Sequence, residues 1–540
     1  MRRNMNVALI SLGLLLGTAG CNSFLTGERL STNPNFPGTA SIEPLFIGTQ
    51  AGQFAFQEGT VAMMMCEWVQ ACSATNSRFV QQAAQYVFGE SSNIGANGGD
   101  WISVYAGGGL TDIRQVETLA RARGDSIWLG IAKIWEALTI GTASDMWGDI
   151  PYSEAGVKPQ PVLDNRFVIL NALQTLLGEA IAELGNGSGA GPGGNDLVFG
   201  GDPDKWIAAA WTLKARYYMH TAESLGTPAY QNAITAALNG ISDPTGASDF
   251  SSFHGTKTAE WNMWAQFQIL SGFGGDLEAG KALVDFMNGR RDPRLPSYFC
   301  QSVSATWKKT TVYKLTALVV DSVDHLQEVT TAGTSGSTEP TWATATGATT
   351  TDGTVTWTNR GPPYGGDDYT TPPTLPISLF DCQPARFAND ARIPYVSYTE
   401  NELILAEAYS ATGNDGNALT HLQNEIDYVN ATYASPQAPK GLAALPAASG
   451  SGAALLAAIM NEKWVATFQN VESINDYRRT CIPNLTPSAN SQGFTNVPGR
   501  LFYPLNERNT NPNVPDPTVQ QATHGFRNAG DVHGCKGDLR

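Results

Sequence analysis

Three carboxylates stand within ten residues of one another, in the stretch Asp145-Met-Trp-Gly-Asp-Ile-Pro-Tyr-Ser-Glu154. Two carboxyl groups held close together can serve as general acid and general base, as they do in glycoside hydrolases. The same side chains also cap helices and hydrogen-bond the backbone of turns. Because no histidine, lysine or metal-ligand spacing accompanies Asp145, Asp149 and Glu154, we favour the structural role over the catalytic one.

The residues before this stretch predict a helix that ends where the three carboxylates lie. Ile127 to Ile140 is rich in alanine and large apolar side chains with few helix breakers, which predicts a buried helix. Gly148 and Pro151 cannot sit in its continuation, so the helix should end just before them. We therefore expect a fixed corner between helices, built from Asp145, Gly148, Asp149, Pro151, Tyr152 and Glu154.

Two further helices should follow the corner. Arg166 to Leu184 is the first. The second opens with Asp202 as its N-cap and a proline at the first helical position, and it runs to Leu225. Gly226 is well placed to end it.

The N-terminus has the pattern of an exported protein. Arg2 and Arg3 precede the apolar run Val7 to Leu16, and small residues lead to Cys21, so residues 1–20 read as a signal peptide. The run is too short to span a membrane, and no later segment approaches twenty uninterrupted apolar residues. Ala19-Gly20-Cys21 resembles the lipobox of bacterial lipoproteins, which implies that Cys21 carries lipid and is the only membrane attachment. Residues 21–44, rich in Asn, Ser, Thr, Pro and Gly, then form a tether.

The composition of the chain argues against some classes of binding partner. The 540 residues carry a formal net charge of −16, and removal of the leader with its two arginines makes it more negative still. Such a surface repels phosphate, and no basic run interleaved with aromatics opposes that repulsion, so nucleic acid is not an expected partner. GxSxG, HExxH and P-loop strings are absent, and none of the six histidines lies at metal-ligand spacing from another. We expect no enzyme activity, cofactor or metal.

Six cysteines follow Cys21, and an even number in an exported chain indicates disulfides. Six cysteines allow fifteen connectivities. Their spacing favours local partners, which would be Cys66 with Cys72, Cys300 with Cys382, and Cys481 with Cys535.

A helix-turn-helix is expected from Asn401 to Tyr433. Leu405-Ala406-x-x-Tyr409, followed by Ala418-x-x-x-Leu422, matches part of the tetratricopeptide pattern, although an ordinary helical hairpin would look the same. One such unit cannot bury its own apolar face, so other helix pairs should stack on it. The expected fold is mainly α, a solenoid of tetratricopeptide-like helical pairs with long loops, in two parts at residues 45–303 and 362–540.

Between these parts, residues 304–361 change to Thr, Val and Gly with spaced aromatics, which predicts a small β insertion. Val312 to Val320 reads as one strand, and Thr351-Asp-Gly-Thr354 as a tight turn between two more. Trp342 and Trp357 could stack on sugar rings as an accessory surface, or they could form the core that so small a module needs.

Several short strings occur in a fixed order along the chain. The first is Gly148-Asp-Ile-Pro-Tyr-Ser-Glu-Ala155 at the corner. The others are Trp206 with Leu213-Lys-Ala-Arg216, Asp292-Pro-Arg-Leu295, Glu402 to Tyr409, Glu462-Lys-Trp464, Asp476-Tyr-Arg-Arg-Thr480 and Arg500-Leu-Phe-Tyr-Pro504. Taken together and in this order, they resemble the SusD/RagB family of outer-membrane lipoproteins, particularly its SusD-like branch, and the corner string is the most recognisable. None of these strings is a catalytic motif.

The resemblance implies a nutrient-binding lipoprotein, anchored by lipid in the outer membrane and facing the cell exterior. It would capture oligosaccharides and deliver them to a SusC-like TonB-dependent transporter. Some relatives capture peptides, so peptide capture is the alternative. A secreted glycoside hydrolase that uses two of the corner carboxylates is a third, less favoured reading.

A glycan-binding role needs aromatic platforms and amide or carboxylate groups. Trp261 and Trp264 lie in a polar, glycine-bounded segment between helices, where large aromatics have less reason to be buried. The full set of expected ligand-binding residues is Trp261, Trp264, Phe273, Asn76, Arg78, Asn93 and Asn97.

Overall fold

The protein is described by a computed structural model over residues 41–75, 80–86, 89–91, 99–270, 276–369, 371–434, 442–486 and 497–522. The expected signal peptide, Cys21 and nearly all of the expected tether lie outside these residues. The first described helix begins at Ile42, inside the range expected for the tether.

Helices make up most of the described structure, as the sequence predicts. In chain order they are α3 (Ile42–Glu58), α4 (Thr60–Trp68), the π-helical turn η1 (Val80–Ala84), α6 (Gly99–Tyr105), α7 (Leu110–Arg123), α8 (Ser126–Trp147), α9 (Arg166–Asn186), α10 (Pro203–Leu225), α11 (Thr227–Ala237), α12 (Met263–Ile269), α13 (Lys281–Gly289), α14 (Leu295–Tyr298), α15 (Tyr398–Ala411), α16 (Asp415–Tyr433), α17 (Gly452–Ala466), α18 (Glu472–Thr480), α19 (Leu505–Thr510) and α20 (Pro517–Ala522).

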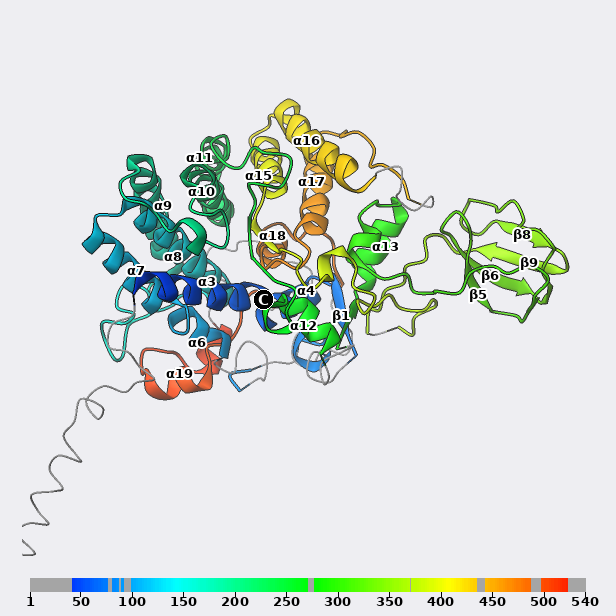
Figure 1. The fold of residues 1–540 in the computed structure, drawn as a ribbon, viewed down its shortest axis with the longest axis horizontal. Helices are drawn as coiled ribbons and strands as arrows, with labels where there is room; N and C mark the ends of the chain where they lie inside the picture. The colour runs from blue at the N-terminus through cyan, green and yellow to red at the C-terminus, as the bar shows by residue number, and fades with distance from the viewer. Residues whose placement is uncertain are drawn as a thin grey trace, which may run out of the picture.

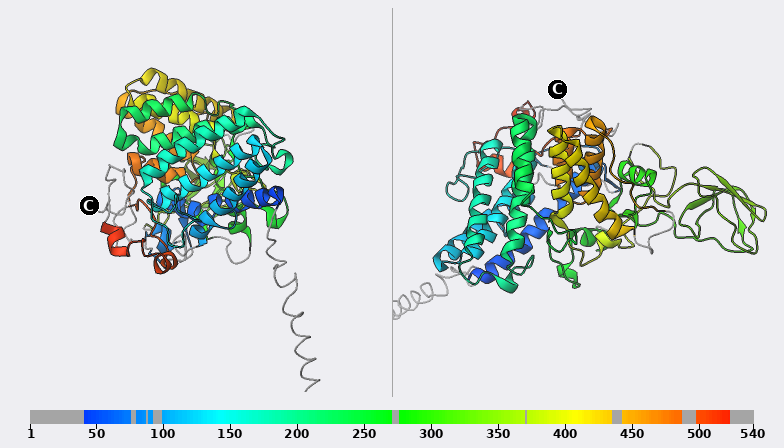
Figure 2. Two further views of the ribbon diagram at one scale, coloured as in Figure 1. Left: turned by 90° about the vertical axis from the view of Figure 1, so that its left-hand side faces the viewer. Right: turned by 90° about the horizontal axis from the view of Figure 1, so that it is seen from above.

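Pairs of consecutive helices stack side by side to form the body (Figures 1 and 2). α8 packs on α9, α10 on α11, and α15 on α16. The pairs join one another because α9 also packs on α10 and α11 on α15. This is the stacking that a single helical pair requires in order to bury its apolar face.

Local signals set the ends of these helices where the sequence predicts. The Asp125 side chain accepts a hydrogen bond from the Trp128 amide at the start of α8, and Gly148 ends the helix at φ 86°. Asp202 caps α10 by accepting from the amides of Asp204 and Lys205. α9 is the one described helix long and apolar enough to cross a membrane, but it is amphipathic and packs on α8 and α10, as helices of a folded body do.

The strands are short and antiparallel. They are β1 (Cys72–Ala74), β2 (Phe250–Ser251), β3 (Leu277–Ala279), β4 (Val312–Tyr313), β5 (Leu318–Val320), β6 (Leu326–Thr331), β7 (Gly333–Thr334), β8 (Thr349–Asp352), β9 (Val355–Asn359) and β10 (Pro394–Val396). β1 pairs with β3 and β10 with β2, which ties distant parts of the body together.

The strands β4 to β9 form a separate module that projects from the helical body (Figure 1). Its main sheet has the order β5-β6-β9-β8, and β4 pairs with β7. The predicted tight turn is present between β8 and β9, with Gly353 at φ 61°. The prediction of one strand over Val312 to Val320 is wrong, because a turn with Thr316 at φ 66° divides it into β4 and β5.

The module's tryptophans are its core. Trp357 is fully buried, and Trp342 and Tyr313 pack edge-on against its ring at centroid distances of 5.7 and 4.7 Å. The Trp357 Nε1 donates to Asp352 Oδ2 at 3.2 Å. Of the two roles that the sequence allows for Trp342 and Trp357, the structure supports the core of the module and not an accessory sugar-binding surface. A sheet this small has few other large side chains with which to fill its interior.

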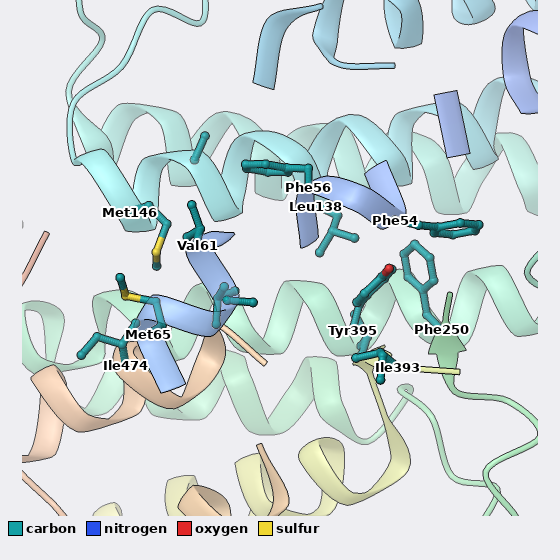
Figure 3. Close-up of a cluster of buried hydrophobic side chains, with 14 of the residues drawn as sticks. Phe54, Phe56, Val61, Met65, Leu138, Met146, Phe250, Ile393, Tyr395 and Ile474 are labelled. Carbon is teal, nitrogen blue, oxygen red and sulfur yellow. The ribbon is translucent and has the colours of Figure 1, made fainter. Parts of the chain in front are cut away.

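The core of the body is assembled from segments far apart in the chain (Figure 3). Phe54 of α3, Phe250 of β2 and Tyr395 of β10 lie together, with ring centroids 6.4 Å apart for Phe54 and Tyr395 and 5.8 Å for Phe250 and Tyr395. The Tyr395 hydroxyl donates to the buried Glu58 carboxylate at 2.8 Å. Mixed aromatic packing of this kind stabilises one arrangement of the three segments.

Two disulfides hold loops against this core. Cys66 is bonded to Cys72 and Cys300 to Cys382, which are two of the three pairs that spacing predicts. The first joins the end of α4 to β1, and the second closes the segment that contains the β module. Cys481 is also disulfide-bonded, and its predicted partner Cys535 lies outside the described residues.

Candidate ligand-binding site

The corner carboxylates are held inside the body. Asp145, at the end of α8, is buried, and its Oδ1 accepts from Arg166 Nη2 at 2.6 Å and Arg478 Nη2 at 3.2 Å. Its Oδ2 accepts from Asn475 Nδ2 at 3.1 Å and lies 3.2 Å from His220 Nδ1. These partners come from α9, α10 and α18, so one carboxylate joins four helices.

The other two corner carboxylates bind backbone amides. Asp149 Oδ1 accepts from the amide of Arg166 at 2.8 Å, which caps the start of α9. Glu154 accepts from the Val162 amide at 3.1 Å and pairs with Lys158. Their oxygens are committed to their own loop, as expected for a structural corner.

Asp145, His220 and Glu472 are the one group of described residues with donor atoms close enough for a metal, all within 4.8 Å of one another. Their electrostatics favour an ion-pair network instead. Burial by itself would raise the pKa of Asp145, but His220, Arg166 and Arg478 hold that pKa well below its usual value. His220 and Arg216 likewise lower the pKa of Glu472 to about 2 against the effect of burial.

His220 completes this network as a cation. Burial would lower its pKa, but Asp145 and Glu472 outweigh that effect and raise it. The His220 Nε2 is 2.6 Å from Glu472 Oε1. A protonated imidazole has no free lone pair for a metal, so His220 neutralises the two carboxylates it touches.

A cleft lies elsewhere, where four segments converge. Its cavity is about 330 Å³. The lining residues come from the end of α4 and β1 (Glu67, Gln70, Cys72, Ser73), from η1 and the residues after it (Ala84, Tyr86), from α13 (Lys281, Ala282, Asp285), and from the later loops (Asp367, Asp368, Tyr369, Thr486).

Backbone pairing fixes these cleft walls. The Cys66–Cys72 bond holds β1 against α4, and β1 pairs with β3 so that Cys72 faces Ala279. α13 starts directly after β3, and the Lys281 amide donates to the Asp367 carbonyl at 2.8 Å. The cleft is therefore built on paired strands and a disulfide, which hold its walls in one arrangement.

The cleft contains a buried carboxyl group that the protein does not satisfy. Glu67 is 2% exposed, and neither of its oxygens makes a hydrogen bond of normal geometry. Burial, together with repulsion from Glu278 and Asp276, raises its pKa well above the usual value, although the Ala84 amide opposes the shift. Burial and the adjacent Asp367 raise the pKa of Glu278 to about 7.

A second pocket, of about 420 Å³, adjoins the cleft at Lys281 and Asp285, which line both. Thr346 and Arg360 of the β module and the loop 371–375 form its other side. We call it the module pocket. A ligand longer than the cleft would meet the inserted module there.

The predicted pair Trp261 and Trp264 does not form one surface. Trp264 is fully buried, with its ring centroid 5.7 Å from that of Phe387, so its expected role as an exposed sugar platform is wrong. The reason is that Trp264 lies on α12, whose first turn is capped by Asn262 and packed inward. Trp261 is half-buried and lines a separate pocket of about 470 Å³ with Phe253 and His254, which we call the Trp261 pocket.

The other five predicted ligand residues, Asn76, Arg78, Asn93, Asn97 and Phe273, lie outside the described residues. Two of these segments are flanked by described residues that contact each other. The amide of Thr75, which precedes residues 76–79, donates to the carbonyl of Asp276, which follows residues 271–275, at 3.1 Å. Sequence reasoning missed Glu67 and Asp367. One signal was visible, because Glu67 is a single carboxylate in the apolar run Val61 to Val69.

A family model described as starch-binding, SusD-like and associating with the outer membrane matches residues 39–504. The chain belongs to the SusD-like family. This SusD-like protein is thus an outer-membrane nutrient-binding protein, and members of the family are non-catalytic binding proteins.

Solved structures share the fold of this SusD-like protein. A chitin-binding protein matches at TM-score 0.65 and 20% identity over 91% of this chain and 100% of its own. A SusD homolog from Bacteroides fragilis matches at TM-score 0.63 and 19% identity over 92% and 100%. A chitin-binding SusD homolog from Flavobacterium johnsoniae matches at TM-score 0.64 and 16% identity over 91% and 99%. A search of curated protein sequences finds no significant match.

Substitution Asp145→Asn should destabilise the protein by about 3–5 kcal/mol, because it leaves Arg166, Arg478 and His220 buried without their common counter-charge. Urea denaturation measures the loss. Glu179→Gln is the matched control, since Glu179 is an exposed partner of Lys133 and should change stability by no more than about 1 kcal/mol. Equal effects of the two substitutions would contradict the central role of Asp145.

Substitution Glu67→Gln should raise Tm, and the gain should grow between pH 4 and pH 8. The pKa of Glu67 is raised above its ordinary 4.5, so the folded protein binds this proton more tightly than the unfolded chain. The wild type therefore loses stability as pH rises above about 4.5, whereas glutamine does not titrate. Calorimetry at both pH values measures the difference, and a gain independent of pH would disprove the interpretation.

Proposed function

We propose that this protein captures oligosaccharides in the cleft and delivers them to a SusC-like TonB-dependent transporter. The observation that carries the proposal is the convergence of four chain segments on a preorganised cleft with an unsatisfied carboxyl group. Small-molecule sites combine a concave shape with a few fixed polar groups, and this cleft has both.

The remaining lining groups suit a sugar. Tyr369 is half-buried and can offer a ring face to a pyranose. Gln70, Ser73 and Thr486 add amide and hydroxyl groups at the same cleft. Two of the similar structures are named as chitin-binding, which supports a glycan as the ligand class.

Peptide capture by the same architecture is the second candidate, as family resemblance implies. A glycoside hydrolase is not supported, because Asp145 and Asp149 are engaged in the body and its helix caps. Membrane attachment would come from lipid on Cys21. The expected tether, residues 21–44, would then be shorter at its end, because α3 begins at Ile42. The protein would then lie on the outer membrane and face the exterior, next to its transporter.

The ligand class can be tested by isothermal titration calorimetry with soluble starch, xylan, chitin and chitosan oligosaccharides and with a peptide mixture. We expect an oligosaccharide to bind. Tyr369→Ala should weaken its binding at least about tenfold, because one stacking contact contributes on that order.

Trp261→Ala is the matched aromatic control, since Trp261 lines a different pocket. The Trp261→Ala protein should bind the oligosaccharide with the same affinity as the wild type. Loss of binding in Trp261→Ala but not in Tyr369→Ala would move the site to the Trp261 pocket. Binding of peptides and of no oligosaccharide would replace the glycan proposal with the peptide one.

Substitution Cys21→Ser should remove the lipid and release the protein from the outer membrane. Fractionation of cells that express the full chain, followed by immunoblotting, measures this. The wild type should sediment with membranes, because stable attachment needs acyl chains buried in the bilayer. A Cys21→Ser protein that still sediments with outer membranes would contradict lipid as the only attachment.

A further inference from the structure

The described residues that line the cleft include more acidic than basic groups. Glu67, Asp285, Asp367 and Asp368 line it, and Lys281 is the one described basic residue among the lining groups. Lys281 is already paired with Asp285. The chain as a whole is also acidic, at a formal net charge of −16. Both the cleft and the surrounding protein therefore attract cations and repel anionic ligands.

Glu67 differs from its neighbours because neither of its carboxyl oxygens makes a hydrogen bond of normal geometry within the protein. Asp367 accepts from the Ser73 hydroxyl at 2.7 Å and from the Tyr369 amide at 2.9 Å, and Asp368 accepts from the Thr371 amide at 2.8 Å. Neither oxygen of Glu67 has such a bond, although its side chain is buried and lines the cleft. A buried polar group without a partner destabilises a fold, so a partner supplied by a ligand would remove that cost.

A metal ion fits this arrangement poorly. The one described group of three carboxylate or imidazole residues with converging donor atoms is Asp145, His220 and Glu472, and it lies in the ion-pair network of the body. The carboxylates of the cleft are distributed along its walls instead. Such spacing suits an extended organic ligand that carries positive charge at several points.

Building on the proposed function, we infer that the cleft selects oligosaccharides with free amino groups, in which one protonated amine donates to Glu67. An ammonium group is compact and carries three donors, which match a carboxylate whose oxygens make no normal hydrogen bonds. The sugar hydroxyls would bind Gln70 and Thr486, while Tyr369 contacts a ring face. An N-acetylated sugar of the same length lacks the charge and places a larger group against Glu67.

Binding would also change the protonation of Glu67. Without ligand, burial and the nearby acids favour its neutral form. An ammonium in contact favours the carboxylate, so a proton leaves Glu67 when the ligand binds. The charge pair formed is shielded from solvent, which makes it stronger than an exposed pair.

The test compares a glucosamine tetramer with an N-acetylglucosamine tetramer by isothermal titration calorimetry at pH 6, where the free amines are charged. We expect the glucosamine tetramer to bind the wild type at least about tenfold more tightly. Glu67→Gln should abolish that preference, so that the two tetramers bind the variant with equal affinity. Glu179→Gln, which removes an exposed carboxylate on α9, should behave as the wild type.

Several outcomes would overturn this inference while leaving the proposed function intact. These are equal affinity of the wild type for both tetramers, and an unchanged preference in Glu67→Gln. Binding of a lysine tripeptide without binding of the glucosamine tetramer would overturn the assignment to an amino sugar. Competition by millimolar CaCl2 at constant ionic strength would replace the amine with a metal ion. Absence of binding to every oligosaccharide would instead refute the proposed function.

Discussion

The body of this protein depends on the burial of one charge, the carboxylate of Asp145. A buried carboxylate is tolerated only with partners, and its partners are distributed over three other helices: Arg166 on α9, His220 on α10, and Asn475 and Arg478 on α18. Each helix must therefore dock in one register to bring its side chain to the same point. The corner loop supports this arrangement, because Asp149 caps the helix that carries Arg166.

The cleft is connected to this network through α18. α4 packs on α18, and Met65 of α4 and Ile474 of α18 both belong to the buried core (Figure 3). Glu67 lies on α4, two residues after Met65. The network therefore positions a helix that holds the cleft's buried carboxyl group, while the Cys66–Cys72 bond holds the end of that helix against β1.

Asp145 and Glu67 show that burial alone does not decide what a carboxyl group does. Both are nearly inaccessible. Two guanidinium groups and an imidazolium hold the pKa of Asp145 low, whereas other carboxylates beside Glu67 add to the effect of burial and hold its pKa high. The first group is structural because its partners are internal, and the second can accept a partner from outside. The β module adds to this second region, since Arg360 and Thr346 line the module pocket beside the cleft.

Local features of this protein could be predicted from its sequence, because short stretches contain their causes. The end of α8 at Gly148, the cap of α10 at Asp202 and the turn at Gly353 each depend on residues a few positions apart. Membership of the SusD-like family could also be predicted, because short sequence motifs occur along the chain in the order typical of the family. Whether a tryptophan is buried could not be predicted in this way. Trp264 and Trp357 are buried by segments whose proximity the sequence does not reveal. The same holds for the partners of Asp145, which are up to 333 residues away, and for a cleft that brings Glu67, Asp285 and Asp367 together. Only the tertiary structure decides such contacts, since they arise when separate helices and strands pack.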